Sequence, residues 1–330
     1  MDYVRFGHTG LKVSRLCLGT MGLGSSAWKG WVLDEAASKP ILRRALDHGI
    51  TFFDMADWYS LGRGEEVVAR NLIAMEKREN LVLATKVFYP MSDDPNDRGL
   101  SRGHILTSID RSLKRMGTDH VDLYIVHAFD PETPIAETME ALHDVVRAGK
   151  ARYLGASTMY AWQFAEMNAV ARANGWTPFV NMQCQLSLLY REEEREMIPY
   201  CEHAGTAVTT FSPLARGYLA NAAPNLRTAH DPYLEWFGDA IDVEIARRVR
   251  DLAARRGVEP SQIAQAWVAG HPGVTTPIIG ADAPEQVDAA VAAAQLVLSD
   301  EERERLEAPY RPRDMINDYN PVRRARELAP

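Results

Sequence analysis

Short apolar runs alternate with longer amphipathic stretches along the whole chain. Each short run is rich in aliphatic or aromatic residues and gives way to polar residues or glycine, which is typical of a buried strand. Eight runs predict strands: Leu16–Gly19, Phe52–Asp54, Val82–Thr85, Val121–Val126, Arg152–Ser157, Phe179–Gln183, Ala207–Ser212 and Thr276–Gly280. This alternation favours an α/β (β/α)8 TIM barrel over a doubly wound sheet, and no linker divides the chain, so residues 1–330 are predicted to form one domain.

The stretches between these runs carry apolar residues at helical spacing. They predict helices at Ile41–Leu46, Glu65–Ala74, Ser101–Met116, Pro134–Ala148, Trp162–Val170, from Glu192 onward, Asp242–Arg255, Ser261–Gly270 and Pro284–Ala294. Ahead of the first strand, Tyr3–Phe6 and Leu11–Val13 predict a β-hairpin that plugs the bottom of the barrel. The stretch Leu214–Gly238 is poorly patterned. The tail after Leu306 is also irregular and is expected to lie over the barrel mouth.

Composition narrows the classes of function. Of the 330 residues, 46% are hydrophobic, which is ample for a large core, and the net charge is −8. Nucleic acid is excluded as the main partner, because phosphate contacts need clustered positive charge. The three cysteines, Cys17, Cys184 and Cys201, are far apart and odd in number, which favours a reducing compartment. With no signal peptide and no apolar run of membrane-spanning length, we expect a cytoplasmic protein without membrane contact, whose oligomeric state is left open.

Side chains suited to proton transfer follow three of the predicted strands. Asp54 ends one strand and is followed by Tyr59, while Lys86 and His127 end the next two. If the strands are parallel, these four residues meet at the rim where α/β enzymes carry their chemistry. Taken singly, each has an ordinary explanation as a turn cap, a core phenol, a solvated charge or a strand-end histidine. Their joint placement at successive strand ends favours a catalytic group.

These four side chains suit general acid–base chemistry on a carbonyl oxygen. A free tyrosine has a pKa of about 10, and the ammonium of Lys86 is expected to lower the pKa of Tyr59. Asp54 would hold Lys86 charged and in place, and a neutral His127 would orient a substrate oxygen. Together they predict a general acid, with Tyr59 delivering the proton.

Later strand ends carry groups that fit a nicotinamide dinucleotide. Gln183 offers an amide for a carboxamide, Phe211 an aromatic face, and Arg216 a bidentate contact to phosphate. Gly280 leaves backbone N–H groups open beside a helix start, which suits an anion. The alternative is that Phe211 belongs to the core and Gly280 to a turn. The loop Gly19–Gly24 lacks the GxGxxG fingerprint of a dinucleotide-binding fold.

Several long motifs, spaced in order along nearly the whole chain, resemble the aldo-keto reductase family. They are Gly7–Met21, Phe53–Glu66, Ala84–Lys86, Gly149–Ser157 and Ser212–Gly217. Within the family, the chain is most similar to bacterial members of the YajO-like type. The resemblance implies an NADP(H)-dependent reductase of the carbonyl reductase or alcohol dehydrogenase type, which converts an aldehyde or ketone to an alcohol or the reverse.

The resemblance also implies roles for individual residues. Tyr59 would donate the proton, Lys86 would depress its pKa, Asp54 would anchor the lysine, and His127 would orient the substrate. The implied cofactor contacts are Thr20, Met21, Asp54, Ser157, Gln183, Phe211, Ser212, Pro213, Leu214, Arg216, Gly280, Asp282 and Gln286. The implied substrate pocket consists of Trp28, Trp31, Trp58, Phe88 and Phe129. Its indoles suggest an aromatic or sugar-like ring as the partner, with ordinary loop packing as the alternative.

Departures from the family pattern bear on the cofactor. Asp282 stands where a hydroxyl or basic residue often meets the 2′-phosphate of NADP, and a carboxylate there would repel that phosphate. Ala289 and Ala290 replace an acidic residue and an asparagine that grip adenine, and Thr158 replaces the asparagine beside Ser157. NADP is therefore the predicted cofactor, with NAD as the alternative.

Two other classes of function compete with a reductase. The first is a non-enzymatic nicotinamide-binding regulatory subunit of the same fold, against which the complete set of four catalytic residues argues. The second is a metal-dependent hydrolase or isomerase, but HxH and HExxH spacings are absent from the sequence, and no metal is expected. The sequence specifies neither the small carbonyl or alcohol substrate nor the direction of the reaction.

Overall fold

Eight parallel strands close into a barrel in the computed structural model, which describes residues 1–220 and 231–315. The strands follow one another in sequence order, and β10 pairs with β3 to complete the circle. Their bounds are β3 Cys17–Gly19, β4 Phe52–Asp54, β5 Val82–Val87, β6 Val121–Val126, β7 Ala151–Ser157, β8 Phe179–Gln185, β9 Ala207–Phe211 and β10 Thr276–Gly280. The predicted TIM barrel is confirmed, and the predicted strands differ from these only at their ends.

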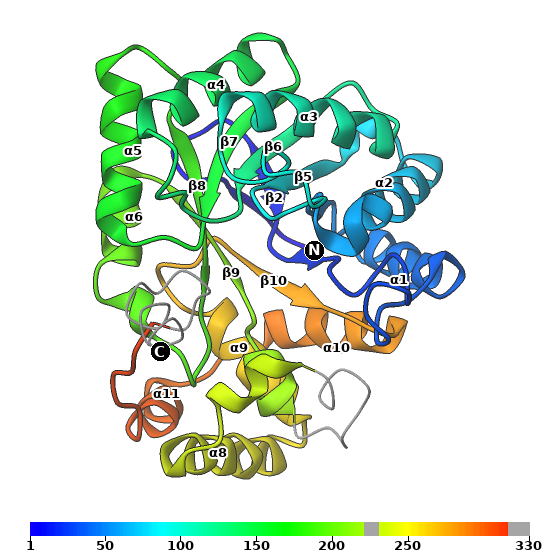
Figure 1. Ribbon diagram of the computed structural model, residues 1–330. Helices are drawn as coiled ribbons and strands as arrows, with labels where there is room; N and C mark the ends of the chain where they lie inside the picture. The colour runs from blue at the N-terminus through cyan, green and yellow to red at the C-terminus, as the bar shows by residue number, and fades with distance from the viewer. Residues whose placement is uncertain (221–230, 316–330) are drawn as a thin grey trace.

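Helices surround the barrel, as Figure 1 shows. Their bounds are α1 Glu35–Asp47, α2 Arg63–Met75, α3 Arg102–Met116, α4 Ile135–Arg147, α5 Ala161–Ala173, α6 Met197–Ala204, α8 Ala240–Arg256, α9 Pro260–Ala269, α10 Pro284–Gln295 and α11 Asp300–Glu307. The helix expected from Glu192 onward instead begins with the 3-10 turn η3, Glu192–Glu194, and the α-helix starts only at Met197. The apolar pattern does not predict α11, although Ser299 and Glu302 form a capping box at its start.

Side-chain alternation decides which face each strand residue serves. Phe52, Ala84 and Ile125 pack together inside the barrel. Their neighbours Phe53 and Tyr124 belong instead to the large core between the strands and the helices. Both faces of the strands are therefore buried, which explains why the strands read as continuous apolar runs.

The predicted N-terminal hairpin is present and covers one end of the barrel. It consists of the antiparallel strands β1, Tyr3–Arg5, and β2, Lys12–Ser14. Phe6 follows β1, is fully buried, and meets the ring of Phe52 edge-on with centroids 5.8 Å apart. Since Phe52 begins β4, the hairpin closes the amino-terminal end and leaves the carboxyl ends of the strands for a site.

Two expectations fall partly on residues outside the described ranges. In the stretch Leu214–Gly238, the structure has the 3-10 turns η4 Ala215–Ala220 and η5 Pro232–Trp236, and residues 221–230 lie outside the described residues. The tail is described only to Met315, so its placement over the barrel mouth stays a prediction. None of the helices in the described ranges is long and apolar enough to cross a membrane.

Candidate active site

Three neighbouring strands bring a carboxylate, an ammonium and an imidazole to the carboxyl end of the barrel. Asp54 ends β4, Lys86 lies near the end of β5, and His127 directly follows β6. Each lies two residues beyond a residue that packs inside the barrel, so all three side chains are directed to the interior. Lys86 Nζ donates hydrogen bonds to Asp54 Oδ2 at 2.6 Å and to the Met55 carbonyl oxygen at 2.8 Å.

The loop after β4 carries Tyr59 to the same place. Lys86 Nζ lies 3.3 Å from the Tyr59 hydroxyl oxygen and 4.9 Å from the centroid of its ring. The ring of His127 stands edge-on to that of Tyr59, with centroids 5.8 Å apart. The structure therefore brings the four predicted catalytic residues together, with Lys86 fully buried and in contact with both Asp54 and Tyr59.

The turn that begins at Tyr59 has an unusual backbone. Ser60, Leu61 and Gly62 all have left-handed φ values, of 53°, 49° and 89°. Residues other than glycine are rare in this region, and such a conformation persists only where the surrounding structure holds it. The position of the phenol therefore depends on what packs against this turn.

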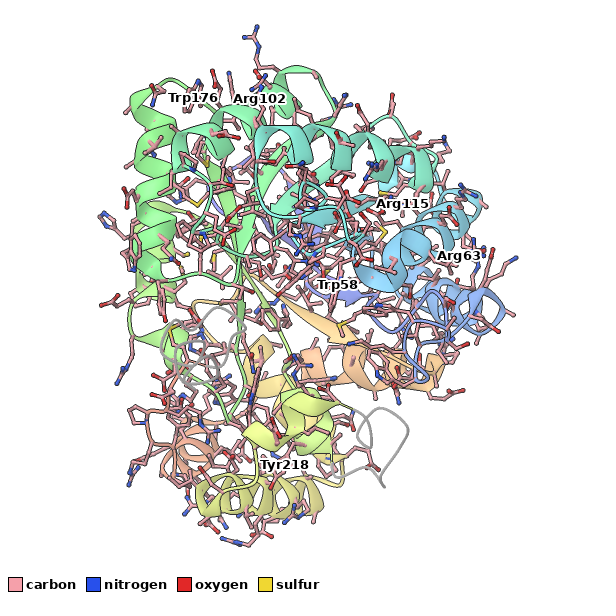
Figure 2. All side chains as sticks on the ribbon, viewed as in Figure 1. Trp58, Arg63, Arg102, Arg115, Trp176 and Tyr218 are labelled. Atoms are coloured by element: carbon pink, nitrogen blue, oxygen red, sulfur yellow. The ribbon has the colours of Figure 1, made fainter. Side chains whose placement is uncertain are left out.

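Arg115 of α3 provides much of that packing. Its Nε donates to Glu65 Oε2 at 2.6 Å, and its side chain fills the space beside Gly62. In Figure 2, Arg115 lies beside α2, the helix that carries Glu65. Glu65 is fully buried and also accepts a 2.5 Å hydrogen bond from Thr85 Oγ1, next to Lys86 in β5. Glu65 thus ties the Tyr59 turn to the strand that carries the lysine.

The electrostatics of the group follow from burial and from Lys86. The pKa of Tyr59 is raised above its ordinary value, because burial raises it more than the charge of Lys86 lowers it. The expectation of a depressed pKa is therefore wrong in its net direction, although the lysine acts as predicted. Burial opposes the charged form of Lys86, but Asp54 and Tyr59 outweigh burial and raise its pKa. Burial and then the charge of Lys86 hold the pKa of His127 well below its usual range, so the imidazole is neutral near pH 7.

A cavity of about 420 Å³ opens in front of these residues. Asp54, Tyr59 and His127 line it, whereas Lys86 lies behind its wall. The cavity is also lined by every other residue expected to contact the cofactor: Thr20, Met21, Ser157, Gln183, Phe211, Ser212, Pro213, Leu214, Arg216, Gly280, Asp282 and Gln286. The structure places all of these residues around the same cavity, and their individual roles stay predictions.

Amide groups line the part of the cavity beside Asp54. Gln183 Nε2 donates to Asp54 Oδ1 at 2.9 Å, a contact that the sequence does not indicate. Ser157 Oγ and Thr158 Oγ1 lie 3.1 Å apart. The buried Nε2 of Gln185 has no hydrogen-bond partner among the described residues. An orphaned amide donor on a cavity wall fits a polar ligand such as a carboxamide, because buried polar groups are normally satisfied.

Groups that suit anions lie elsewhere on the same cavity. Arg216 Nη1 donates to Asp231 Oδ2 at 2.9 Å. The Asp282 N–H donates to Gln286 Oε1 at 2.7 Å, just before α10 begins at Pro284. A guanidinium and a helix start fit the phosphates of a dinucleotide, whereas the Asp282 carboxylate does not favour a further phosphate beside it.

The aromatic residues predicted for the substrate pocket separate into two groups. Trp58, labelled in Figure 2, lines the cavity. Trp28, Trp31, Phe88 and Phe129 do not line it in the described part of the chain. Trp28 packs edge-on against Trp58 with ring centroids 5.1 Å apart, so it supports the wall from behind.

Several residues of the wall were not anticipated from the sequence. Tyr89 lies between Trp58 and His127, with its centroid 4.8 Å from each of their rings. Lys29 also lines the cavity. The sequence offers one hint for each: Tyr89 lies close to Lys86 in the chain, and Lys29 lies between Trp28 and Trp31. Further lining residues with no local signal include Ala220, Trp236, Ser261 and Gln265.

Comparisons with known proteins agree with this geometry. Residues 15–311 match the family model described as "Aldo/keto reductase family". The chain is 41% identical to the versiconal hemiacetal acetate reductase of Aspergillus parasiticus, over 95% of this chain and 98% of the relative. It is 40% identical to the aldo-keto reductase AMT2 of Alternaria alternata, over 94% and 91%. It is 37% identical to the putative aryl-alcohol dehydrogenase AAD16 of Saccharomyces cerevisiae, over 94% and 97%.

Proposed function

The chain belongs to the aldo/keto reductase family, and on that premise we propose that Tyr59, Lys86, Asp54 and His127 perform the proton transfer of its reaction. The protein is an NAD(P)H-dependent oxidoreductase that interconverts a carbonyl compound and an alcohol. The observation that carries the proposal is the contact of one buried ammonium with both Asp54, at 2.6 Å, and the Tyr59 hydroxyl, at 3.3 Å. The relatives named above are fungal and do not bear on a closer likeness to bacterial YajO-like members, which therefore remains a proposal.

The proposed chemistry divides among the four side chains. When bound, a reduced nicotinamide supplies the hydride for the carbonyl carbon. The Tyr59 hydroxyl, which like an ordinary phenol carries its proton near neutral pH, donates that proton to the carbonyl oxygen. Lys86 then stabilises the phenolate, and Asp54 keeps the ammonium in place. Neutral His127 hydrogen-bonds the substrate oxygen and orients it toward Tyr59.

We further propose NADP(H) as the cofactor, with NAD(H) as the alternative. Phe211 would stack on the nicotinamide, Arg216 would hold the pyrophosphate, and Gly280 and Gln286 would lie at the adenosine end. The orphaned Gln185 amide and the helix start at Pro284 support a dinucleotide in this cavity. The Asp282 carboxylate supports the alternative, and direct titration with NADPH and NADH decides between them.

The proposed substrate is an aryl aldehyde or ketone, or the corresponding alcohol. Rings line the cavity next to His127, and aromatic side chains stack favourably on aromatic ligands. One relative carries the name of a putative aryl-alcohol dehydrogenase and another that of a hemiacetal acetate reductase. Trp28, Trp31, Phe88 and Phe129 would shape this pocket from outside the cavity wall.

The test removes only the acidic hydroxyl. Tyr59→Phe should lower kcat for benzaldehyde reduction by at least about a thousandfold, because both the proton donor and the phenolate are lost. NADPH binding, followed by its fluorescence, should persist. Tyr3→Phe is the matched control, since the Tyr3 hydroxyl contacts the Gly49 carbonyl at the hairpin end of the barrel.

Two outcomes would count against the proposal. A Tyr59→Phe enzyme as fast as the parent would remove Tyr59 from the chemistry. A parent that binds NADPH tightly but turns over none of a broad panel of aldehydes and ketones would favour the regulatory-subunit alternative.

A further inference from the structure

One lysine stands among indoles at the edge of the cavity. Lys29 lies in the loop between β3 and α1, is half-buried, and lines the cavity wall. Its Nζ lies 4.7 Å from the centroid of Trp28, 5.5 Å from that of Trp58 and 5.8 Å from that of Trp31. Cation–π contacts with three rings restrict the position of the ammonium.

A continuous row of rings joins this ammonium to the catalytic group. Trp58, beneath the ammonium, lies against Tyr89 with centroids 4.8 Å apart and an interplanar angle of 32°. Tyr89 in turn meets His127 at 4.8 Å. Trp58, Tyr89, His127 and Lys29 all line the same cavity. A ligand whose carbonyl lies at His127 and Tyr59 would therefore extend along aromatic walls toward Lys29.

The contacts of the charged lining residues show where several of them stand. In the described part of the chain, the charged lining residues are Lys29, Asp54, Arg216 and Asp282. Asp54 contacts Lys86, and Arg216 is paired with Asp231. Lys29 contacts the ring of Trp58, which in turn lies against Tyr89, so this cation stands at the aromatic part of the wall.

We propose that Lys29 binds a carboxylate carried on the ring of an aryl aldehyde or ketone substrate. The inference rests on the proposed function, because it places the carbonyl at Tyr59 and His127. The aryl ring would pack against Trp58 and Tyr89, and the ammonium would form a charge-assisted hydrogen bond to the carboxylate. Low-dielectric aromatic walls strengthen such a contact relative to one in open water. Lys29 then selects substrates that are anionic at the end remote from the carbonyl.

The test compares two substrates that differ in this charge alone. The parent should reduce 4-carboxybenzaldehyde with a higher kcat/KM than its methyl ester, methyl 4-formylbenzoate. Lys29→Met should lower the ratio of the two values by tenfold or more, chiefly through KM for the acid. Raising the salt concentration should shrink the ratio in the parent and not in the variant. Lys12→Met, in the hairpin at the opposite end of the barrel, is the matched control and should keep the parental ratio.

A second measurement separates this inference from the proposed reaction. Tryptophan fluorescence of the Tyr59→Phe protein with NADPH present should report 4-carboxybenzaldehyde binding, and Lys29→Met should weaken that binding by a similar factor. If the parent reduces neither aldehyde but binds the acid through Lys29, the reaction is wrong and the anion site stands. An unchanged ratio in Lys29→Met would overturn the inference. Loss of NADPH affinity in place of acid selectivity would likewise overturn it, since Lys29 would then serve the cofactor.

Discussion

Burial and charge compete at Tyr59, and burial prevails. Residue types and spacing reveal that a lysine stands beside this phenol, and its effect on the pKa has the expected sign. They do not reveal how deeply the phenol is buried, which depends on loops from several strands. A net raised pKa keeps the proton on the phenol but makes it a weaker acid, so the opposing effect of Lys86 is what assists release of the proton. Reverse reaction from the alcohol would require the phenolate and should therefore be favoured at alkaline pH.

Glu193 shows the same effect of burial outside the site. Burial and then the charge of Glu192 raise its pKa to about 8. Since an unfolded glutamate titrates near about 4.3, the folded state holds this proton more tightly. The stabilisation is complete below the unfolded pKa and is lost as the pH rises toward and through about 8, by up to about 1.4 kcal/mol per pH unit.

Glu193→Gln should remove this pH dependence, because the amide does not titrate. The free energy of unfolding in urea, measured at pH 5, 6.5 and 8, should fall less in the variant than in the parent. Glu196→Gln changes an exposed neighbour and serves as the control. Equal losses in Glu193→Gln and the parent would show that Glu193 is not the group that titrates.

At the level of elements, the strands were predictable and several loops were not. An apolar run such as Val121–Val126 is buried on both faces, so its sequence alone identifies it. The apolar pattern does not predict α11, because Leu306 is the only buried residue of this helix. A helix that buries so little has no apolar stripe to detect. The shape of the Tyr59 turn is not predictable for a different reason. Ser60 and Leu61 adopt left-handed conformations that only long-range packing imposes.

Gly62 tests how much that turn matters. A Cβ at this position would lie 2.6 Å from Arg115 Cδ, so Gly62→Ala should displace the arginine in addition to straining the backbone. Gly257→Ala is a matched control, because Gly257 also has a positive φ, of 66°, but a Cβ there would have no atom of the described residues within 4 Å. Both should lose about 1–2 kcal/mol of stability. Only Gly62→Ala should also lower kcat, by roughly tenfold, since a small misplacement of a catalytic group is costly. Equal kcat values in the two variants would show that Arg115 does not position Tyr59.

At the scale of the whole molecule, residues far apart in sequence build one cavity around residues that motifs could identify. Asp54 and Gln183 are predictable as separate strand ends, but their 2.9 Å hydrogen bond exists only because the barrel closes. Trp236 reaches the same cavity from the poorly patterned stretch Leu214–Gly238, and Gln265 reaches it from α9. Parallel strands place the chemistry at one end, while the details of the wall depend on how loops pack across it.

The described end of the tail is hydrogen-bonded to the cavity wall through Arg313. Arg313 Nη2 donates to Asp242 Oδ1 at 2.6 Å, and Asp242 is fully buried. Arg313 Nη1 also donates to the carbonyl oxygen of Trp236 at 3.4 Å, and Trp236 lines the cavity. The backbone N–H of Arg313 donates to Glu192 Oε1 at 2.8 Å. Arg313 therefore connects the tail both to α8 and to the segment beside the proposed cofactor.

Arg313→Met should both destabilise the protein and weaken the anchoring of the Trp236 segment that lines the cavity. Removing one partner of a buried ion pair costs about 3–5 kcal/mol, because Asp242 would remain charged without its cation. Urea unfolding should show this loss, and NADPH titration should show weaker binding as the Trp236 segment loses its anchor. Adding Asp242→Asn should restore part of the stability, because it removes the uncompensated charge, but should not restore NADPH affinity. Arg311→Met is the control, since within residues 1–220 and 231–315 the side chain of exposed Arg311 donates to nearby backbone carbonyls alone. If Arg313→Met unfolds at the same urea concentration as Arg311→Met and binds NADPH equally well, the tail has no part in holding the cavity.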